Sequence, residues 1–194
     1  MAEPAVAAAT QRLKRPLVLV GLMGSGKSSV GRRLAAALGA EFVDADDEIM
    51  SAAGRSIAEI FEQYGEREFR ALERRVIARL MSEAPGSPKV IATGGGAFMD
   101  PMTRTVVGEK AVSVWLKAEL DVLVSRTAGR THRPLLNAGN PREILSSLIE
   151  VRYPVYALAD VAVESPGGIT HERMADRIIS ALKSHGKAFA PEAD

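Results

Sequence analysis

The sequence predicts an α/β domain built on a mostly parallel β-sheet. Short runs of apolar and β-branched residues alternate along the chain with segments of helical periodicity, as in successive βαβ units. The run Leu17-Val18-Leu19-Val20 is apolar at every position, which is typical of a strand covered on both faces. The length of 194 residues suits one such domain with a well-buried core.

Five segments are expected to form the strands of this sheet. All are short and contain apolar or β-branched residues: 17–20, 41–44, 89–93, 111–116 and 160–164. Because helical segments separate them, neighbouring strands are expected to be parallel.

The first two helices carry clear end signals. A helix over 27–38 is followed by Gly39, a residue that favours the left-handed conformation found after a helix end. Ser56 and Glu59 have the spacing of a capping box, in which each side chain bonds the other residue's backbone N–H. The helix that begins there is expected to stop near Gly65.

Apolar periodicity predicts the remaining helices. One helix presents a stripe spaced by three and four residues, made of Phe69, Leu72, Val76 and Leu80, and ends before the turn at 85–88. Later helices are expected over 119–128, 141–153 and 170–183. Residues 129–140 form a polar loop, and a loop of this length in a compact domain is often functional.

The ends of the chain are expected to be flexible. Residues 1–15 are Ala-rich without the apolar core of a secretory signal, and residues 184–194 are polar and contain proline. The folded domain is therefore expected over 16–183.

Composition limits the partners and the compartment. The net charge of +1 predicts no broad basic surface for nucleic acid, and no apolar run approaches the length of a membrane span. The absence of cysteine is compatible with a reducing cytosol. We expect a cytoplasmic protein without a nucleic-acid or membrane partner.

A phosphate-binding motif follows the first strand. Residues 21–28 match G-x-x-x-x-G-K-[ST] without a mismatch, between a predicted strand and a predicted helix. Backbone N–H groups of such a P-loop converge on nucleotide phosphates, Lys27 reaches the β and γ oxygens, and Ser28 ligates Mg²⁺. The nucleotide-binding residues expected here are Gly24, Ser25, Gly26, Lys27, Ser28 and Ser29. The alternative is a glycine-rich turn that only caps a helix.

The P-loop predicts a nucleotide but does not specify the reaction. The D-x-x-G and N-K-x-D motifs of GTPases are absent from the sequence, and the chain is short for a motor ATPase. A small kinase that uses ATP and Mg²⁺ is the favoured class.

Two acids follow the second predicted strand. Asp44 and Asp46 are two residues apart, so in an extended backbone both carboxylates face the same way. At the carboxyl end of a strand beside the P-loop they overlook the place where ligands bind in open α/β sheets. One is expected to help hold hydrated Mg²⁺, and the other to accept a proton from the attacking hydroxyl. The alternative is that these acids only begin a helix.

Other candidate residues are weaker on their own. Gly94, Gly95 and Gly96 follow the third predicted strand, where a ligand can approach the backbone closely or where a turn alone needs glycine. Arg70 and Arg152 lie on predicted helices, and most arginines are solvated surface residues.

Taken together, the motifs resemble those of shikimate kinases. The matching order and spacing comprise the P-loop, Asp44-x-Asp46, Phe69-Arg70, Gly94-Gly95-Gly96, Arg133-Pro134-Leu135-Leu136 and Arg152-x-Pro154-x-Tyr156. The resemblance runs from about residue 17 to 182. It implies a fold like that of the nucleoside monophosphate kinases, a five-stranded parallel sheet with a mobile lid at about 129–140.

The resemblance also implies the reaction and the residue roles. ATP phosphorylates the 3-hydroxyl of shikimate, in the pathway to chorismate and the aromatic amino acids. The implied roles are a base that binds the substrate hydroxyls (Asp46), a contact to the Mg²⁺ shell (Asp44), a clamp on the substrate carboxylate (Arg70 and Arg152), a substrate-binding amide (Gly95), a lid arginine over the transferred phosphate (Arg133) and a residue against adenine (Arg126).

Rival interpretations remain at this point. Another small-molecule kinase, such as a gluconate or nucleoside monophosphate kinase, shares the P-loop, and an ATP-binding regulatory protein without catalysis is a different class. Residues 163–168 lack the basic residue that some relatives carry near adenine, so only Arg126 is assigned there. Arg74 and Arg75 are expected on a solvated helix face, His132 is not expected to ligate a metal, and a monomer is expected.

Overall fold

The computed structural model describes residues 13–82, 89–128 and 139–190. Within these ranges five parallel strands form one sheet in the order β2-β3-β1-β4-β5. The strands are β1 (Leu17–Val20), β2 (Glu41–Asp44), β3 (Lys89–Ala92), β4 (Val112–Lys117) and β5 (Val161–Glu164). The predicted parallel α/β sheet is thus confirmed, with strand ends within one residue of those expected.

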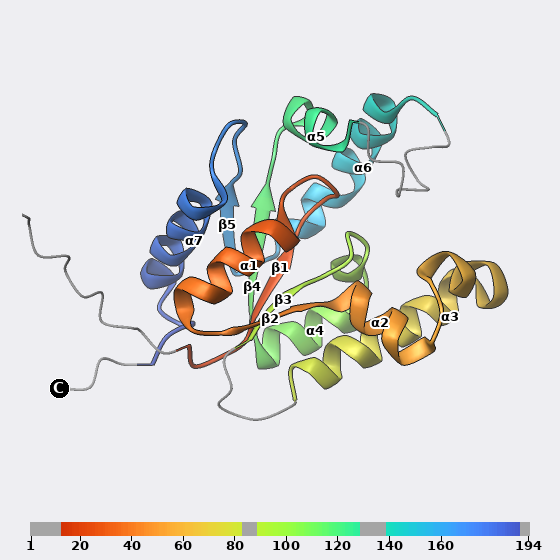
Figure 1. Cartoon of the computed structure of the whole chain (residues 1–194), viewed down its shortest axis with the longest axis horizontal. Coiled ribbons are helices and arrows are strands. Elements are labelled where there is room, and N and C mark those ends of the chain that lie inside the picture. The colour runs from red at the N-terminus through yellow and green to blue at the C-terminus, as the bar shows by residue number, and fades with distance from the viewer. Residues whose placement is uncertain (1–12, 83–88, 129–138, 191–194) are drawn as a thin grey trace, which may run out of the picture.

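Helices cover both faces of the sheet (Figure 1). Helices α1 (Lys27–Leu38) and α7 (His171–His185) pack together on one face, and α3 (Ile57–Leu80), α4 (Pro101–Lys110), α5 (Leu120–Thr127) and α6 (Pro141–Tyr156) contribute to the core on the other. Leu17 and Leu19 belong to the first of these cores, and Val18 and Val20 to the second. This alternation explains why β1 is apolar at every position.

The predicted helix-end signals lie where the sequence puts them. Gly39 follows α1 with φ 60°, and Ser56 and Glu59 form the reciprocal capping box at the start of α3. At Gly65 the backbone leaves the helical conformation, with φ 77° and ψ 174°, so α3 consists of two helical halves joined by a kink at the predicted end of the first. Glycine fits there because side chains with a β carbon avoid this conformation.

A helix after β2 was only the alternative interpretation of the acids there, and α4 was not expected. Helix α2 (Ala45–Ala53) begins directly after β2, with Asp44 as its N-cap, and α4 begins after the N-cap Asp100 with Pro101 at its first turn. A short 3₁₀ turn, η1 (Ala97–Met99), precedes α4. The Asp-Pro pair was the available signal for α4, because proline is favoured at the first helical position.

The expected domain boundaries at 15 and 184 need correction. Helix α7 runs to His185, Leu13 forms an antiparallel bridge with Phe189, and the Lys14 amide donates to the Ala188 carbonyl at 2.8 Å. Leu13 and Ala188 are buried. The two ends therefore hold one another against the core, a pairing between distant segments that neither segment reveals alone.

The connections of the sheet diverge beside β1. The chain leaves β1 through α1 toward β2, whereas it leaves β3 through α4 toward β4 on the opposite side. Because ligands of open α/β sheets bind at such a divergence, outside the carboxyl ends of the strands, the site is expected where the segments after β1, β2 and β3 meet.

Candidate active site

The P-loop connects β1 to α1 and leaves the start of the helix open to an anion. Gly24 and Gly26 have φ values of 84° and 100°, and no side chain caps α1 at Gly26. A β carbon on Gly24 would lie 3.0 Å from Thr127 Cγ2, so the loop also packs tightly against α5. Uncapped N–H groups at a helix start attract phosphate.

Two P-loop side chains are already oriented by hydrogen bonds. Lys27 Nζ donates to the carbonyl oxygens of Gly21 at 2.8 Å and Leu22 at 3.0 Å. Ser28 Oγ donates to Asp44 Oδ2 at 2.7 Å, whereas Ser29, the next residue on α1, is exposed. The lysine ammonium and the serine hydroxyl thus lie on the same loop that presents the open helix end.

Asp44 and Asp46 are neighbours, but not through an extended backbone as the sequence argument assumed. Helix α2 begins at Ala45, and Asp44 Oδ1 accepts from the Asp46 amide at 3.1 Å as the N-cap bond. Burial raises the pKa of Asp46, and the nearby Asp44 carboxylate raises it further. The positive charges of Lys27 and Arg70 lower this pKa but do not cancel the rise. The alternative that these acids begin a helix is therefore confirmed for Asp44, which also accepts a hydrogen bond from Ser28.

The three glycines after β3 each lie against a different charged side chain. A β carbon on Gly94 would lie 2.8 Å from Asp46 Oδ1, one on Gly95 would lie 3.2 Å from Arg152 Nη1, and one on Gly96 would lie 2.4 Å from Arg70 Nη2. Side chains at these positions would displace the carboxylate and both guanidinium groups. The triplet is thus a backbone surface on which Asp46, Arg70 and Arg152 converge from α2, α3 and α6.

Glu73 was not singled out from the sequence. Its side chain is 2% exposed, and Oε2 accepts from Arg70 Nη1 at 2.7 Å, while the exposed Glu66 accepts from Arg70 Nη2 at 3.2 Å. Burial raises the pKa of Glu73 to about 7, although Arg70 opposes the shift. Glu73 Oε1 has no hydrogen-bond partner among the described residues. An acid three residues after Arg70 beside the apolar stripe was the signal for this buried pair.

Helix α6 supplies Arg152 and Tyr156. Tyr156 is fully buried and donates its hydroxyl to the Gly95 carbonyl. Burial raises the pKa of Tyr156 to about 12, with Arg152 opposing the shift, so the hydroxyl remains a donor. The helix continues through Pro154 to Tyr156, three residues beyond the predicted end. This continuation explains the motif Arg152-x-Pro154-x-Tyr156, since α6 places both side chains against the glycine triplet.

Arg126 lies on α5 beside the P-loop and the segment after β5. Its Nη1 donates to Ser165 Oγ at 2.9 Å and its Nη2 to the Pro166 carbonyl at 2.8 Å, and burial lowers its pKa. The buried Ser165 Oγ donates in turn to the Ser25 carbonyl at 3.2 Å. Ser165 therefore joins the P-loop to the segment that lacks the basic residue of some relatives, a role that no sequence motif indicated.

The predicted lid, Arg74 and Arg75 differ in how they compare with the structure. Arg133, His132 and most of the predicted lid lie outside the described residues, and Asn140 at the end of that loop caps α6. Arg75 is exposed as expected. Arg74 is not on a solvated face, because it pairs with Asp100 at 2.8 Å and is 31% exposed.

The residues present fit a magnesium nucleotide. Ser28 and Asp44 offer hydroxyl and carboxylate oxygens beside the open start of α1. Among the described residues, no group of three or more acidic, histidine or cysteine side chains could hold a metal. Mg²⁺ needs no such group, since it binds through one or two protein oxygens together with water and substrate phosphates.

Comparisons with known proteins agree on one family. The shikimate kinase family model matches residues 23–183. A shikimate kinase of Paramagnetospirillum magneticum is 58% identical over 154 residues, which cover 79% of this chain and 77% of that one. A shikimate kinase of Caulobacter vibrioides is 53% identical over 169 residues, with coverages of 87% and 82%.

In the described part of the chain, no helix is both long enough and apolar enough to cross a membrane.

Solved structures give the same result. The shikimate kinase from Acinetobacter baumannii in complex with shikimate superposes with a TM-score of 0.81 at 35% identity, covering 89% of this chain and 94% of that one. A gluconokinase from Sinorhizobium meliloti has a TM-score of 0.60 at 22% identity, with coverages of 90% and 94%, and shares the fold alone. With a P-loop kinase fold and a family match over most of its length, this chain belongs to the shikimate kinase family.

Proposed function

We propose that the protein transfers the γ-phosphoryl group of ATP to the 3-hydroxyl of shikimate, giving shikimate 3-phosphate and ADP. The observation that carries this proposal is the convergence of Asp46, Arg70 and Arg152 on the backbone of the glycine triplet. One carboxylate and two guanidinium groups beside the backbone of these glycines suit a ligand that has both hydroxyls and a carboxylate. Shikimate has this chemistry, and the family agrees.

The two arginines are proposed to bind the substrate carboxylate with the amides of Gly94, Gly95 and Gly96. Arg70 is held by Glu73 and Glu66, so its charge is maintained in a partly buried position, where burial lowers its pKa but the two acids raise it overall. A guanidinium group that is oriented before the substrate arrives loses less freedom on binding. The clamp therefore favours a planar carboxylate over an uncharged polyol.

Asp46 is proposed to accept the proton of the attacking hydroxyl. As the hydroxyl oxygen bonds to the γ-phosphorus, the bond from that phosphorus to the β,γ-bridging oxygen breaks and ADP leaves. Burial and Asp44 raise the pKa of Asp46 toward neutral pH, which makes this carboxylate a stronger base than an exposed aspartate.

The nucleotide is proposed to bind with its phosphates on the amides of Gly24, Ser25 and Gly26, and with Lys27 on the β and γ oxygens. Ser28 and Asp44 would hold Mg²⁺ or its water shell, and Ser29 lies next along α1. When bound, Mg²⁺ neutralises charge on the phosphate oxygens. Arg126 is proposed to lie against adenine, and Arg133 to cover the transferred phosphate from a lid over 129–140 that excludes water.

Gluconate is the rival acceptor, because a gluconokinase shares the fold. ADP release from Mg·ATP should be measured with shikimate, gluconate and AMP in parallel. Strong stimulation by shikimate alone is expected. Stimulation by gluconate or AMP instead would overturn the substrate and the roles given to Asp46, Arg70 and Arg152.

Two variants then separate chemistry from binding. Asp46→Asn should lower kcat by at least about a hundredfold with a smaller change in either KM, as expected for a lost general base. Arg152→Lys should mainly raise KM for shikimate, because an ammonium group cannot bind a carboxylate through two parallel bonds. Equal weakening of ATP and shikimate would contradict the clamp. We also propose that the enzyme acts as a cytoplasmic monomer.

A further inference from the structure

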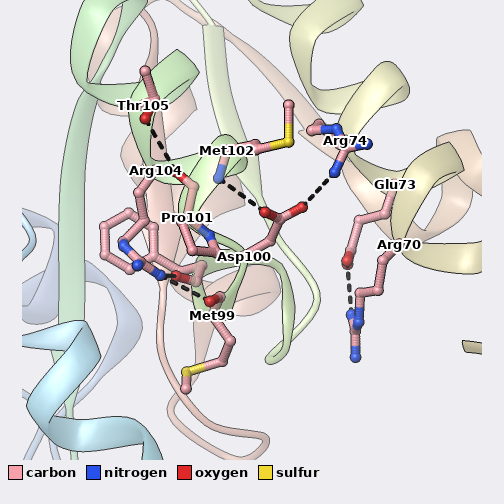
Figure 2. A network of polar contacts seen from close by, with 10 residues as sticks. Arg70, Glu73, Arg74, Met99, Asp100, Pro101, Met102, Arg104 and Thr105 are labelled. Carbon is pink, nitrogen blue, oxygen red and sulfur yellow. Dashed lines mark hydrogen bonds and ion pairs between the residues drawn. The ribbon is translucent and has the colours of Figure 1, made fainter. Parts of the chain in front are cut away.

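An ion pair joins α3 to the segment that follows the glycine triplet. Arg74 lies one helical turn after Arg70, and its Nη1 is 2.8 Å from Asp100 Oδ2, across 26 residues of sequence. Figure 2 shows the two side chains pointing toward one another, next to the separate pair of Arg70 and Glu73. The pair is partly buried, with the side chains 31% and 15% exposed.

Asp100 is held from two sides. Its Oδ1 accepts from the Met102 amide at 2.8 Å, which caps α4, while Oδ2 accepts from Arg74. Burial alone would raise the pKa of Asp100, but the Met102 amide and Arg74 outweigh burial and lower this pKa. The carboxylate therefore stays ionised near neutral pH. A single side chain thus fixes the start of α4 relative to α3.

The residues just before Asp100 are tied to the same unit. Arg104 on α4 donates to the carbonyls of Phe98 at 2.7 Å and Met99 at 2.8 Å (Figure 2). The Met99 amide donates to the Gly96 carbonyl at 3.0 Å, and the Ala97 amide to the Gly94 carbonyl at 3.2 Å. The glycine triplet, η1 and the start of α4 therefore form one hydrogen-bonded unit.

This unit meets α3 again at Arg70. A β carbon on Gly96 would lie within 2.7 Å of three atoms of the Arg70 guanidinium group, which leaves little room between that group and the backbone. Any shift of the unit along α3 would change the position of the Gly95 and Gly96 amides relative to Arg70. Arg74 and Asp100 are the side-chain pair that opposes such a shift.

We propose that Arg74 and Asp100 are positioning residues for the acceptor site. Their ion pair sets the spacing between the Arg70 guanidinium group and the amides of the glycine triplet, and so the fit of the acceptor's carboxylate. The inference rests on the proposed function, because it assigns the spacing to shikimate binding. ATP binds on the P-loop, outside this unit, and is not expected to be affected.

If the Arg74–Asp100 pair only stabilised the fold, its loss would lower Tm without a selective change in KM for shikimate. Buried apolar residues on α3 and α4, including Val76, Ile77 and Val107, already hold these helices in one core. A partly exposed ion pair adds little to the free energy of unfolding by comparison. The positioning role should therefore appear in KM for shikimate more than in Tm.

The test compares Arg74→Met with Arg75→Met. Methionine keeps most of the aliphatic stem, and Arg75 is the exposed neighbour on the same helix. Asp100→Asn removes the charge and keeps a side-chain oxygen for the Met102 amide, so the α4 cap is retained. Arg74→Met and Asp100→Asn should each raise KM for shikimate about tenfold, the effect of losing one charge-assisted hydrogen bond, with KM for ATP within twofold of wild type.

The double variant and the wild type complete the test. Arg74→Met/Asp100→Asn should resemble either single variant, because one interaction is removed in all three. Arg74→Lys should recover part of the loss. A KM for shikimate within twofold of wild type in both single variants would overturn the positioning role, as would an equal rise in both KM values. If the wild-type enzyme itself shows no shikimate-dependent ADP release, the proposed function fails, and this inference with it.

Discussion

Asp46 and Glu73 direct one carboxylate oxygen each at the same point above Gly94. A β carbon at that point would lie 2.8 Å from Asp46 Oδ1 and 3.1 Å from Glu73 Oε1. The two acids come from α2 and α3. Burial is the largest cause of the raised pKa of Glu73, and the Asp46 carboxylate raises that pKa further. The base proposed for catalysis and the acid that holds Arg70 thus lie on either side of a position that only glycine leaves open.

Gly94→Ala should disable the acceptor site while leaving nucleotide binding intact. The added methyl group would displace Asp46 and Glu73, and a displacement near 1 Å of a catalytic group lowers the rate by about a hundredfold. Steady-state kinetics should show that loss in kcat/KM for shikimate, with KM for ATP unchanged. Gly108→Ala on α4, where a β carbon meets nothing within 4 Å, is the control and should behave as wild type.

Glu73→Gln should change how stability depends on pH. Folding raises the pKa of this acid from 4.5 to about 7, because the buried carboxyl group holds its proton more tightly than in the unfolded chain. The resulting contribution to stability is complete below about pH 4.5 and is lost as the pH rises through about 7. The change has a ceiling of about 3 kcal/mol, from ~1.4 kcal/mol for each unit of pKa. The free energy of unfolding of the wild type should fall more steeply from pH 5 to pH 8 than that of the variant.

Denaturant unfolding at several pH values checks this prediction. Glu66→Gln is the matched control, because Glu66 also pairs with Arg70 but is 70% exposed. Its pH profile should run parallel to that of the wild type. Parallel profiles for Glu73→Gln as well would mean that the pKa of Glu73 is not raised in the folded chain.

Ser165→Ala should weaken ATP binding selectively. The buried hydroxyl joins Arg126 to the Ser25 carbonyl, so its loss leaves two polar groups beside the P-loop without this partner. Loss of such a bond suggests a rise of about five- to tenfold in KM for ATP, with KM for shikimate unchanged. Ser180→Ala, at an exposed position on α7, should change neither constant. A selective effect on shikimate would argue against the nucleotide-side assignment.

Gly65→Ala should destabilise the fold. The backbone at Gly65 has φ 77° and ψ 174°, a region almost confined to glycine, and holding alanine there costs about 1–3 kcal/mol. Thermal unfolding should show a lower Tm for this variant. At Gly108, inside α4, alanine should instead raise stability by up to about 1 kcal/mol. An unchanged Tm for Gly65→Ala would indicate that the kink relaxes without strain.

Local patterns were sufficient for much of this protein. The strand runs, the capping box at Ser56 and the P-loop all depend on residues that are close in sequence, and such signals act whatever the rest of the chain does. The order of the motifs was likewise enough to indicate the family, because spacing along the chain is preserved when a fold is preserved.

Only the tertiary structure decided which side chains meet. The sequence places Glu73 beside the apolar stripe of its helix, but only the fold buries it next to Gly94 and Arg70, where burial raises its pKa to about 7. Arg74 belongs by periodicity to a polar face, but Asp100 reaches it from 26 residues away. Leu13 and Phe189, near opposite ends of the chain, are likewise brought together only by the fold, through an antiparallel backbone bridge. The physical reason is that burial and electrostatic contact depend on distances in space, which the packing of α2, α3, α4 and α6 around the glycine triplet sets.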